Sequence, residues 1–389
     1  MPSDRPAKMP PQTKKSPLLN SPGWSGVVRR QLEKLVLKGA GRQLPVVFDF
    51  DNTVVCGDIG EATLALLVRE GSLSADRLPE ALSPALVPET GRPVTAASAV
   101  DLTEYYEAFL APTAHGPKDP FPQANGYLWA VQAMQGLDLH TVVDATRRVM
   151  EGSRPGGGNR LDVTPGRTSY PIPWFYPEMV ELIAALIRHE YDLWIVSASN
   201  VWTVRWMALH GLNPLLRAQG VRSGISPRQV VGVSTLMADR QGRLYKDSVL
   251  TRENRDYAWQ REPAMKALRV TSHPQYPAPT YSGKVGAIWD VIGRRPYLCA
   301  GDSPGDLPML AFSENRLWMA RLEKPDYQKA ALKLMRQADA GQWVVQPVLA
   351  SQSPGFIGSR AQLSQRLARP SPGIAQSLRL LRDHSGKNF

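Results

Sequence analysis

Cysteine is scarce in this sequence, and long hydrophobic runs are absent. The 389 residues include two cysteines, Cys56 and Cys299, which are too few for the disulfide framework of a small secreted protein. A single disulfide between them stays open at this point. No apolar run approaches the roughly 20 residues that a membrane-spanning helix needs. The first 26 residues are polar and proline-rich, without the apolar stretch of a secretion signal, so we expect a cytoplasmic protein.

Acidic residues are outnumbered, and the excess of basic residues lies at the two ends of the chain. The net charge is +11, of which residues 1–30 and 351–389 each carry +5, leaving +1 for residues 31–350. A basic chain can bind nucleic acid, but here the interior of the sequence is close to neutral. We therefore expect basic, weakly ordered tails at 1–25 and 351–389 and no stable nucleic-acid partner. Docking of these tails on an anionic partner is the alternative.

The order of periodic segments predicts an α/β protein with an inserted helical domain. Residues 26–39 have helical spacing, and an apolar strand follows at 46–48. Four segments within 59–152 each carry one apolar face, which is typical of helices. Residues 153–173 are rich in glycine and proline and are expected to be a connector. Later, short apolar strands alternate with helices, as in parallel sheets, at 175–190, 192–199, 201–211, 229–239, 284–293, 296–303 and 316–321.

The predicted fold class is thus a Rossmann-like parallel sheet with a helical cap inserted after the first strand. The core is expected to comprise residues 26–58 and 166–350, and the cap residues 59–165.

Polar side chains follow three of the predicted strands where each strand ends. Ligands bind beyond the carboxyl ends of the strands in sheets of this kind. The residues there are acids and hydroxyls, with one lysine at the start of a predicted helix: Asp49, Asp51, Thr53, Ser197, Lys284, Asp302 and Asp306. Mg²⁺ prefers oxygen ligands and shares them with phosphate. Phosphoryl transfer requires in-line positioning and charge neutralisation, and this set of residues provides the groups for both.

Four motifs at these positions, DFDNT, VSAS, GK and GDSPGD, occur in the order typical of the haloacid-dehalogenase-like superfamily of phosphatases. The chain resembles that family over residues 45–58 and about 175–321. The resemblance implies that Asp49 is the nucleophile and that Asp51 is the general acid and base. It further implies that Asp302, Asp49 and the backbone carbonyl of Asp51 hold Mg²⁺.

The same resemblance implies roles for the remaining motif residues. Thr53 and Ser197 would hold phosphate oxygens, and Lys284 would neutralise the phosphoryl charge and orient the nucleophile. Asp306 would support Lys284 or the waters of the metal without touching the substrate. Dehalogenases resemble the family without the second acid of DFDNT, and P-type ATPases have threonine in its place, so both branches are disfavoured.

The substrate is expected to be a small phosphate ester with a positively charged leaving group. The sequence resembles the phosphoserine phosphatase branch, and most closely bacterial phosphorylcholine phosphatases, through Asp58, VVGVSTLM, SGKVGAI and LWMAR. The acid at Asp58 would face the cation, and Tyr105, Tyr106 and Trp129 would supply aromatic faces. These aromatic residues also have the spacing of a helical core, which is the alternative interpretation.

Three other functions remain open from the sequence. The first is a phosphoserine phosphatase, whose substrate carboxylate would need a cation such as Arg69. The second is a phosphatase whose basic tails bind a large anionic substrate, although a cap would cover the site. The third is a catalytically silent binding protein, against which the complete motif set argues.

Overall fold

A seven-stranded sheet forms the centre of the core domain. The computed structural model describes residues 18–87, 92–110, 126–251, 262–337 and 342–382. The strand order is β14-β13-β12-β11-β1-β6-β7, and all neighbours are parallel except β13 and β14. The predicted α/β class with a parallel sheet is confirmed. The strands are β1 (Pro45–Phe48), β6 (Asp192–Asn200), β7 (Val230–Val233), β11 (Leu298–Gly301), β12 (Asn315–Arg321), β13 (Gln342–Leu349) and β14 (Gly355–Phe356).

Helices cover both faces of this sheet because the strand side chains alternate between two apolar layers. Val46 and Phe48 face one layer and Val47 faces the other. The first layer includes α1 (Gly26–Gly39), α6 (Pro177–Arg188), α7 (Val201–Trp206) and α8 (Asn213–Ala218). The second includes α11 (Ser282–Val291), α12 (Leu307–Phe312), α13 (Pro325–Met335), α14 (Arg360–Arg366) and α15 (Pro372–Leu381).

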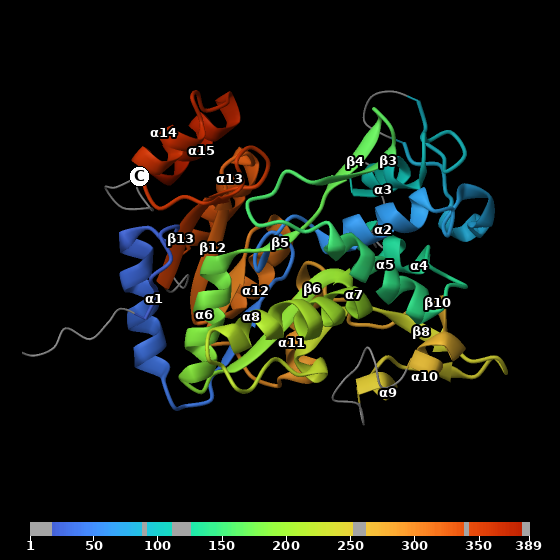
Figure 1. Ribbon diagram of the computed structural model, residues 1–389, viewed down its shortest axis with the longest axis horizontal. Helices are drawn as coiled ribbons and strands as arrows, with labels where there is room; N and C mark the ends of the chain where they lie inside the picture. The colour runs from blue at the N-terminus through green and yellow to red at the C-terminus, as the bar shows by residue number, and fades with distance from the viewer. Residues whose placement is uncertain (1–17, 88–91, 111–125, 252–261, 338–341, 383–389) are drawn as a thin grey trace, which may run out of the picture.

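A second body, the cap, lies on the right of Figure 1, over the carboxyl ends of the strands. The pair β2 (Val55–Cys56) and β5 (Trp174–Phe175) joins it to the core. The cap helix α2 begins where Asp58 accepts a hydrogen bond from the backbone N–H of Glu61 at 2.8 Å. The cap contains α2 (Ile59–Arg69), α3 (Leu102–Leu110), α4 (Gly126–Gln132), α5 (Leu139–Glu151), β3 (Arg160–Thr164) and β4 (Thr168–Pro171).

The chain enters the cap a second time, which the sequence did not predict. Residues 229–239 were expected to form one strand, but the run divides between β7 of the core sheet and β8 (Thr235–Ala238) of another sheet. That sheet has the order β10-β8-β9. Its strand β10 joins the loop after α4 through Val270, whose backbone bonds Gly136 and Leu137 at 2.9 Å. The remaining elements of this insertion are β9 (Leu244–Tyr245), β10 (Arg269–Pro274), α9 (Ser248–Thr251) and α10 (Glu262–Ala267).

The expected connector at 153–173 is in part a β-hairpin, formed by β3 and β4. A glycine-rich turn at Gly156, Gly157 and Gly158 with positive φ precedes it. The glycine- and proline-rich composition of this segment is typical of turns and hid the short strands, in which Asp162 has low β-propensity.

The prediction of flexible tails is wrong for the segments that the structure describes. Leu19 and Trp24 are buried, and the Trp24 ring contacts Phe356 of β14 edge-on at a centroid distance of 5.0 Å. At the other end, Ile374 and Leu381 of α15 are buried against the core. The apolar faces of these segments stabilise them despite their basic composition. Residues 1–17, which carry four of the basic residues, lie outside the described part of the chain.

The two cysteines are free and buried, so the disulfide left open above is not formed. Within the described residues, none of the helices combines the length and the apolar character needed to cross a bilayer.

Candidate active site

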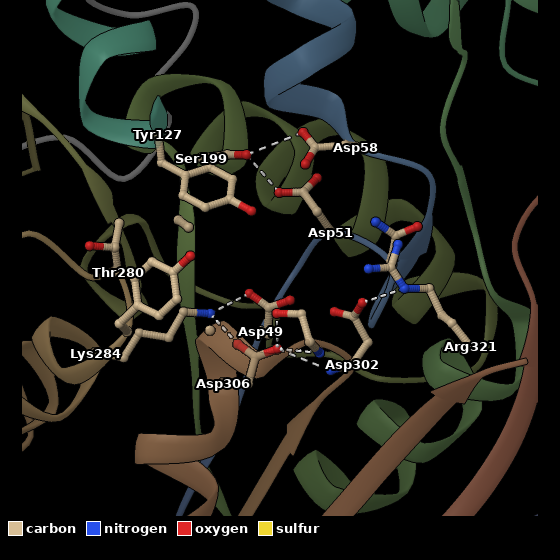
Figure 2. A pocket seen from close by; sticks show the side chains of 15 residues that line it. Asp49, Asp51, Asp58, Tyr127, Ser199, Thr280, Lys284, Asp302, Asp306 and Arg321 are labelled. Atoms are coloured by element: carbon tan, nitrogen blue, oxygen red, sulfur yellow. Dashed lines mark hydrogen bonds and ion pairs between the residues drawn. The ribbon is translucent and has the colours of Figure 1, made fainter. Parts of the chain in front are cut away.

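A cavity lies between the core and the cap, at the carboxyl ends of the central strands. Figure 2 shows that its core wall is formed by acids, Lys284 and Arg321, while Tyr127 approaches from cap helix α4. Asp49 follows β1, Asp302 follows β11 and Arg321 ends β12. Because these strands are parallel neighbours, side chains far apart in the sequence meet at one edge of the sheet.

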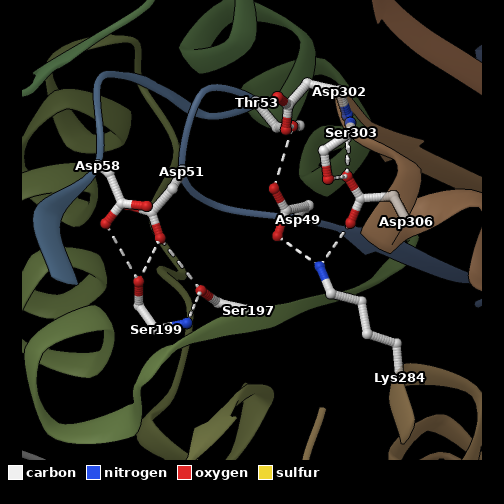
Figure 3. A network of polar contacts seen from close by, with 10 residues as sticks. All are labelled: Asp49, Asp51, Thr53, Asp58, Ser197, Ser199, Lys284, Asp302, Ser303 and Asp306. Carbon is white, nitrogen blue, oxygen red and sulfur yellow. Dashed lines mark hydrogen bonds and ion pairs between the residues drawn. The ribbon is translucent and has the colours of Figure 1, made fainter. Parts of the chain in front are cut away.

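Lys284 connects two of the acids. Its Nζ lies 2.6 Å from Asp49 Oδ1 and 2.6 Å from Asp306 Oδ1, and all three side chains are almost fully buried. The second oxygen of Asp306 accepts hydrogen bonds from the backbone N–H groups of Asp302 and Ser303 at 3.0 Å. Asp306 thus holds Lys284 from behind, and Lys284 fixes one oxygen of Asp49 (Figure 3).

The carboxylates of Asp49, Asp302 and Asp306 are arranged so that they fit a divalent cation. One oxygen of each lies within 4.8 Å of the other two. Asp302 Oδ2 is ion-paired with Arg321 Nε at 2.8 Å, so Oδ1, 3.3 Å from the hydroxyl of Thr53, is the oxygen that Asp302 can offer to a cation. Hard oxygen donors without nitrogen or sulfur suit Mg²⁺. The side chain of Asp51 is not in this group; the role expected for Asp51 uses its backbone carbonyl.

Thr53 lies behind the cavity wall, and phosphate binding by its hydroxyl stays a prediction. Its side chain is fully buried, and its hydroxyl lies 3.3 Å from both Asp49 Oδ2 and Asp302 Oδ1. The hydroxyl therefore bridges two carboxylates behind the cavity. The sequence could not show which side of the turn the threonine faces.

Asp51 has a separate set of hydrogen bonds. Its Oδ1 accepts from the backbone N–H of Ile59 at 2.8 Å, and its Oδ2 from the hydroxyls of Ser199 at 2.7 Å and Ser197 at 3.3 Å (Figure 3). Ser197 is fully buried and does not line the cavity, whereas Ser199, which sequence reasoning missed, does. Ser199 could have been found from the strand period, because residues two apart share a face.

Burial raises the pKa values of these acids in the absence of a bound cation. Desolvation, followed by repulsion from Asp306, raises the pKa of Asp49 to about 7 despite the attraction of Lys284. Desolvation raises the pKa of Asp302 to about 8, although Arg321 opposes the shift. Desolvation and then Asp58 raise the pKa of Asp51 well above its ordinary value. Burial alone would lower the pKa of Lys284, but Asp306 and Asp49 outweigh it and raise that pKa.

Asp58 lies on the wall of the cavity, at the start of cap helix α2. Its Oδ1 accepts from Glu61 N and lies 3.4 Å from the hydroxyl of Ser199 (Figure 2). Desolvation, and then repulsion from Glu61, raises the pKa of Asp58 to about 8. Desolvation, followed by Asp51, raises the pKa of Glu61 to about 7.

The predicted aromatic residues divide between the cavity and the interior of the cap. Tyr106 lines an adjoining cavity that shares Tyr127 and Ser199 with the first. Tyr105 and Trp129 line neither cavity, which corrects their predicted role: the Tyr105 hydroxyl bonds the carbonyl of Pro84, and Trp129 Nε1 bonds that of Leu82 at 2.7 Å.

For Tyr105 and Trp129 the helical spacing therefore reflects packing, as the alternative interpretation held. Tyr105 and Trp129 are in contact, with their rings edge-on at 5.4 Å.

Besides Ser199, the residues on the cavity wall that were not anticipated include Tyr127, Tyr281 and Arg321. Arg321 ends a strand of the sheet, so the rule that identified the acids would have identified it too. Tyr281 has a positive φ of 48° at the start of α11 and is half exposed, and nothing in its local sequence indicates this placement.

Comparisons with known proteins identify similar folds. Neither a model of a known family nor a curated protein matches this sequence. A conserved protein of unknown function from Anaerococcus prevotii DSM 20548 is similar in structure, with a TM-score of 0.60 and 19% identity over 88% of this chain and 98% of that one. At this identity the likeness concerns the fold.

Two further solved structures are similar at lower scores. A substrate-bound phosphoserine phosphatase has a TM-score of 0.36 and 13% identity, over 74% of this chain and 90% of that one. A HAD family hydrolase from Salmonella enterica serovar Typhi has the same score and identity, over 74% and 70%.

Proposed function

We propose that this protein is a phosphomonoester hydrolase of the haloacid-dehalogenase-like type, with Asp49 as the nucleophile and Asp51 as the general acid and base. The observation that carries the proposal is that the two acids share one cavity but have different partners. Asp49 is ion-paired with Lys284, whereas Asp51 accepts hydrogen bonds from neutral groups. A nucleophile needs the charged form, which the lysine favours, and an acid needs the protonated form, which burial favours.

In the first step of the proposed reaction, an oxygen of Asp49 bonds to phosphorus while the bond from phosphorus to the leaving oxygen breaks. Asp51 gives its proton to that oxygen. In the second step Asp51 takes a proton from water, whose oxygen attacks phosphorus and releases inorganic phosphate and Asp49. Lys284 stabilises negative charge on the phosphoryl oxygens and holds the nucleophile in place.

The acid cluster fits Mg²⁺, and Asp49, Asp302 and the backbone carbonyl of Asp51 would hold it. When bound, the ion would neutralise charge on the phosphoryl oxygens. Thr53 and Ser197, which lie behind Asp49 and Asp51, hold the acids in position rather than the phosphate, and Asp306 holds Lys284.

We infer a small, amine-bearing substrate of the phosphocholine class. Asp58 and Glu61 are acids on the walls of the two joined cavities, and Tyr106 and Tyr127 supply aromatic faces there. A quaternary ammonium group is held by such faces and by carboxylates. Phosphoserine is the second candidate substrate. Arg321 on the same wall is a cation that could pair with the carboxylate of phosphoserine. Arg69, proposed from the sequence, does not line either cavity.

The proposal is tested with purified protein and a panel of phosphomonoesters: an aryl phosphate, phosphocholine, phosphoethanolamine, phosphoserine and a sugar phosphate. We expect turnover that EDTA abolishes and Mg²⁺ restores, with the highest kcat/KM for a cationic ester. Asp49→Asn should lower kcat on the order of 10⁴-fold or more, because the attacking charge is lost while the shape is kept.

The matched control is Asp290→Asn, the same change at an exposed acid of α11. Substantial residual turnover by Asp49→Asn, or full activity in excess EDTA, contradicts the mechanism. A preference for neutral sugar phosphates contradicts the cationic substrate and leaves the phosphatase intact.

A further inference from the structure

Arg321 is a cation in the cavity to which the proposed hydrolysis of a cationic ester gives no task. It is the last residue of β12, beside the strand whose end carries Asp302. Its Nε lies 2.8 Å from Asp302 Oδ2, and the two side chains are 14% and 3% exposed (Figure 2). A guanidinium group so placed has lost most of its hydration, which requires compensation from its surroundings.

The two oxygens of Asp302 have different neighbours. Oδ1 lies 3.3 Å from the hydroxyl of Thr53, which is also 3.3 Å from Asp49 Oδ2, so this side of the carboxylate faces the nucleophile. Oδ2 faces Arg321 instead. The contact is an ion pair without the angles of a hydrogen bond. Arg321 therefore attracts one edge of the carboxylate and leaves the other edge toward Asp49.

Arg321 is itself held in place. Its guanidinium carbon lies 5.2 Å from the centre of the Tyr327 ring, within the range of a cation–π contact. Tyr327 belongs to α13, which packs in the layer of helices behind the sheet. The Lys324 ammonium lies over the same ring at 5.8 Å, but this side chain is exposed and does not line the cavity.

We propose that Arg321 is a positioning residue, which turns Asp302 so that its Oδ1 edge faces Asp49 and is ready to bind Mg²⁺. This inference rests on the proposed function, because it assigns Asp302 to the metal. Arg321 acts from behind the carboxylate and does not contact the ion. Residues that orient metal ligands in this way contribute about 10- to 100-fold to metal affinity.

Two rival tasks for Arg321 follow from the same position. It could compete with the cation for Asp302, in which case its removal would tighten Mg²⁺ binding. It could also bind an anionic group of the substrate, in which case its removal would weaken phosphate binding and leave Mg²⁺ binding unchanged.

The experiment measures Mg²⁺ binding to the full chain by isothermal titration calorimetry without substrate, and Mn²⁺ binding by electron paramagnetic resonance. The decisive variant is Arg321→Lys, which keeps the positive charge but loses the planar group that orients the carboxylate. We expect its Mg²⁺ Kd to rise about tenfold. Tyr327→Leu, which removes the ring behind the guanidinium, should also raise the Mg²⁺ Kd, but by less than Arg321→Lys does.

The matched control is Lys324→Met, which removes the other cation on the same ring and should leave the Kd within about twofold of the wild type. Thermal melts in EDTA establish whether each variant is folded. If Arg321→Lys does not fold, Tyr327→Leu provides the test. In the folded variants the Ki of inorganic phosphate is measured at saturating Mg²⁺, where we expect it to be unchanged.

An unchanged or lower Mg²⁺ Kd in the folded variants overturns the inference, and so does a raised phosphate Ki with normal Mg²⁺ binding. These results leave the proposed function intact if the wild type hydrolyses phosphate esters with Mg²⁺. Absence of Mg²⁺ binding to the wild type overturns both.

Discussion

Asp51 and Asp49 lie one residue apart on the same turn, yet their side chains have different hydrogen-bond and ion-pair partners in the cavity. The hydroxyls of Ser199 and Ser197 and the N–H of Ile59 converge on Asp51, so its orientation is set without a charged partner. A protonated acid there is needed for a poor leaving group and is unnecessary for a good one. The water-activating task in the second step remains in both cases.

Asp51→Asn should therefore trap the phosphorylated enzyme. With an aryl phosphate that has a good leaving group, the first step survives and the second loses its base. We expect kcat to fall about 10²- to 10⁴-fold and intact-protein mass spectrometry to detect a chain heavier by one phosphoryl group. Asp49→Asn/Asp51→Asn should show no such adduct. If Asp51→Asn turns over the aryl ester at the normal rate, Asp51 is not the base.

The position of Asp58 and its raised pKa predict that kcat/KM depends on pH in a way that is specific to cationic substrates. Its pKa is raised to about 8, so below that pH it is largely protonated and cannot attract a cation. The ratio of kcat/KM for phosphocholine to that for an aryl phosphate should then rise as pH increases through about 8. Taking the ratio removes the titration of Asp49, which affects both substrates equally. A neutral alkyl phosphate, whose leaving group needs the proton of Asp51 as choline does, is the second reference and removes the titration of Asp51.

Asp58→Asn tests this assignment because asparagine also caps helix N-termini and should preserve α2. A desolvated charge partner contributes about 2–3 kcal/mol, so we expect the phosphocholine kcat/KM at high pH to fall roughly 30- to 150-fold. The rate for the aryl phosphate should barely change, and the pH dependence of the ratio should disappear. An equal loss for both substrates would show that Asp58 acts on the phosphoryl group or on the fold.

At the scale of elements, the segment before α1 is a structural part of the core. The Trp24 ring is 5% exposed, packs on Phe356 of the edge strand β14 and donates its Nε1–H to Glu181 of α6 at 3.1 Å. It therefore ties together α6, the last strand of the sheet and the chain that leads into α1.

Trp24→Ala should lower the free energy of unfolding by about 3–5 kcal/mol, the usual cost of truncating a large buried aromatic side chain. Urea denaturation followed by circular dichroism measures it, with Leu37→Ala on the exposed face of α1 as the control, for which we expect less than about 0.5 kcal/mol. A small effect of Trp24→Ala would mean that this segment does not hold the core together.

The elements also show what the sequence could and could not predict. Alternating strands and helices predicted the parallel sheet. Polar residues at strand ends pointed to Asp49 and Asp302, and a lysine at a helix start pointed to Lys284, because these signals are local. The division of residues 229–239 at Ser234 was missed, since an apolar run does not reveal which sheet each half joins. The placement of Trp129 was wrong for a similar reason: helical spacing does not distinguish a cap interior from a cavity wall.

At the scale of the whole molecule, the acid cluster links stability to pH and to Mg²⁺. The folded-state pKa values of Asp49 and Asp302 are raised to about 7 and 8. Between the ordinary carboxyl pKa near 4 and these values, the folded protein binds more protons than the unfolded chain. The stability that these protons add is fully present below about pH 4 and is lost as pH rises through 7 to 8.

Without metal, the contribution of these acids to stability should therefore decrease from pH 6 to pH 9, which lowers the melting temperature of the protein. Mg²⁺ should raise the melting temperature more at pH 9 than at pH 6. Differential scanning calorimetry in EDTA and in Mg²⁺ measures both effects. Asp302→Asn should flatten the pH dependence in EDTA and reduce the Mg²⁺ effect, whereas Asp290→Asn should do neither. A Mg²⁺ effect that does not grow with pH contradicts the assignment of the cation to these acids.

The second insertion into the cap limits how the two bodies can separate. The chain crosses from core to cap near Asp58, returns at β5, crosses again after β7 and returns at Tyr281, immediately before the helix that carries Lys284. A cap that is joined to the core by one pair of chain connections can rotate about a single axis. A cap that is joined by two pairs has fewer rigid-body rotations available. The motion that admits substrate is expected to be a narrow rocking that pulls on α11. In mechanical terms, we expect that opening the entrance would loosen Lys284, the cation proposed to neutralise the phosphoryl group, and that closing it would set Lys284 against Asp49.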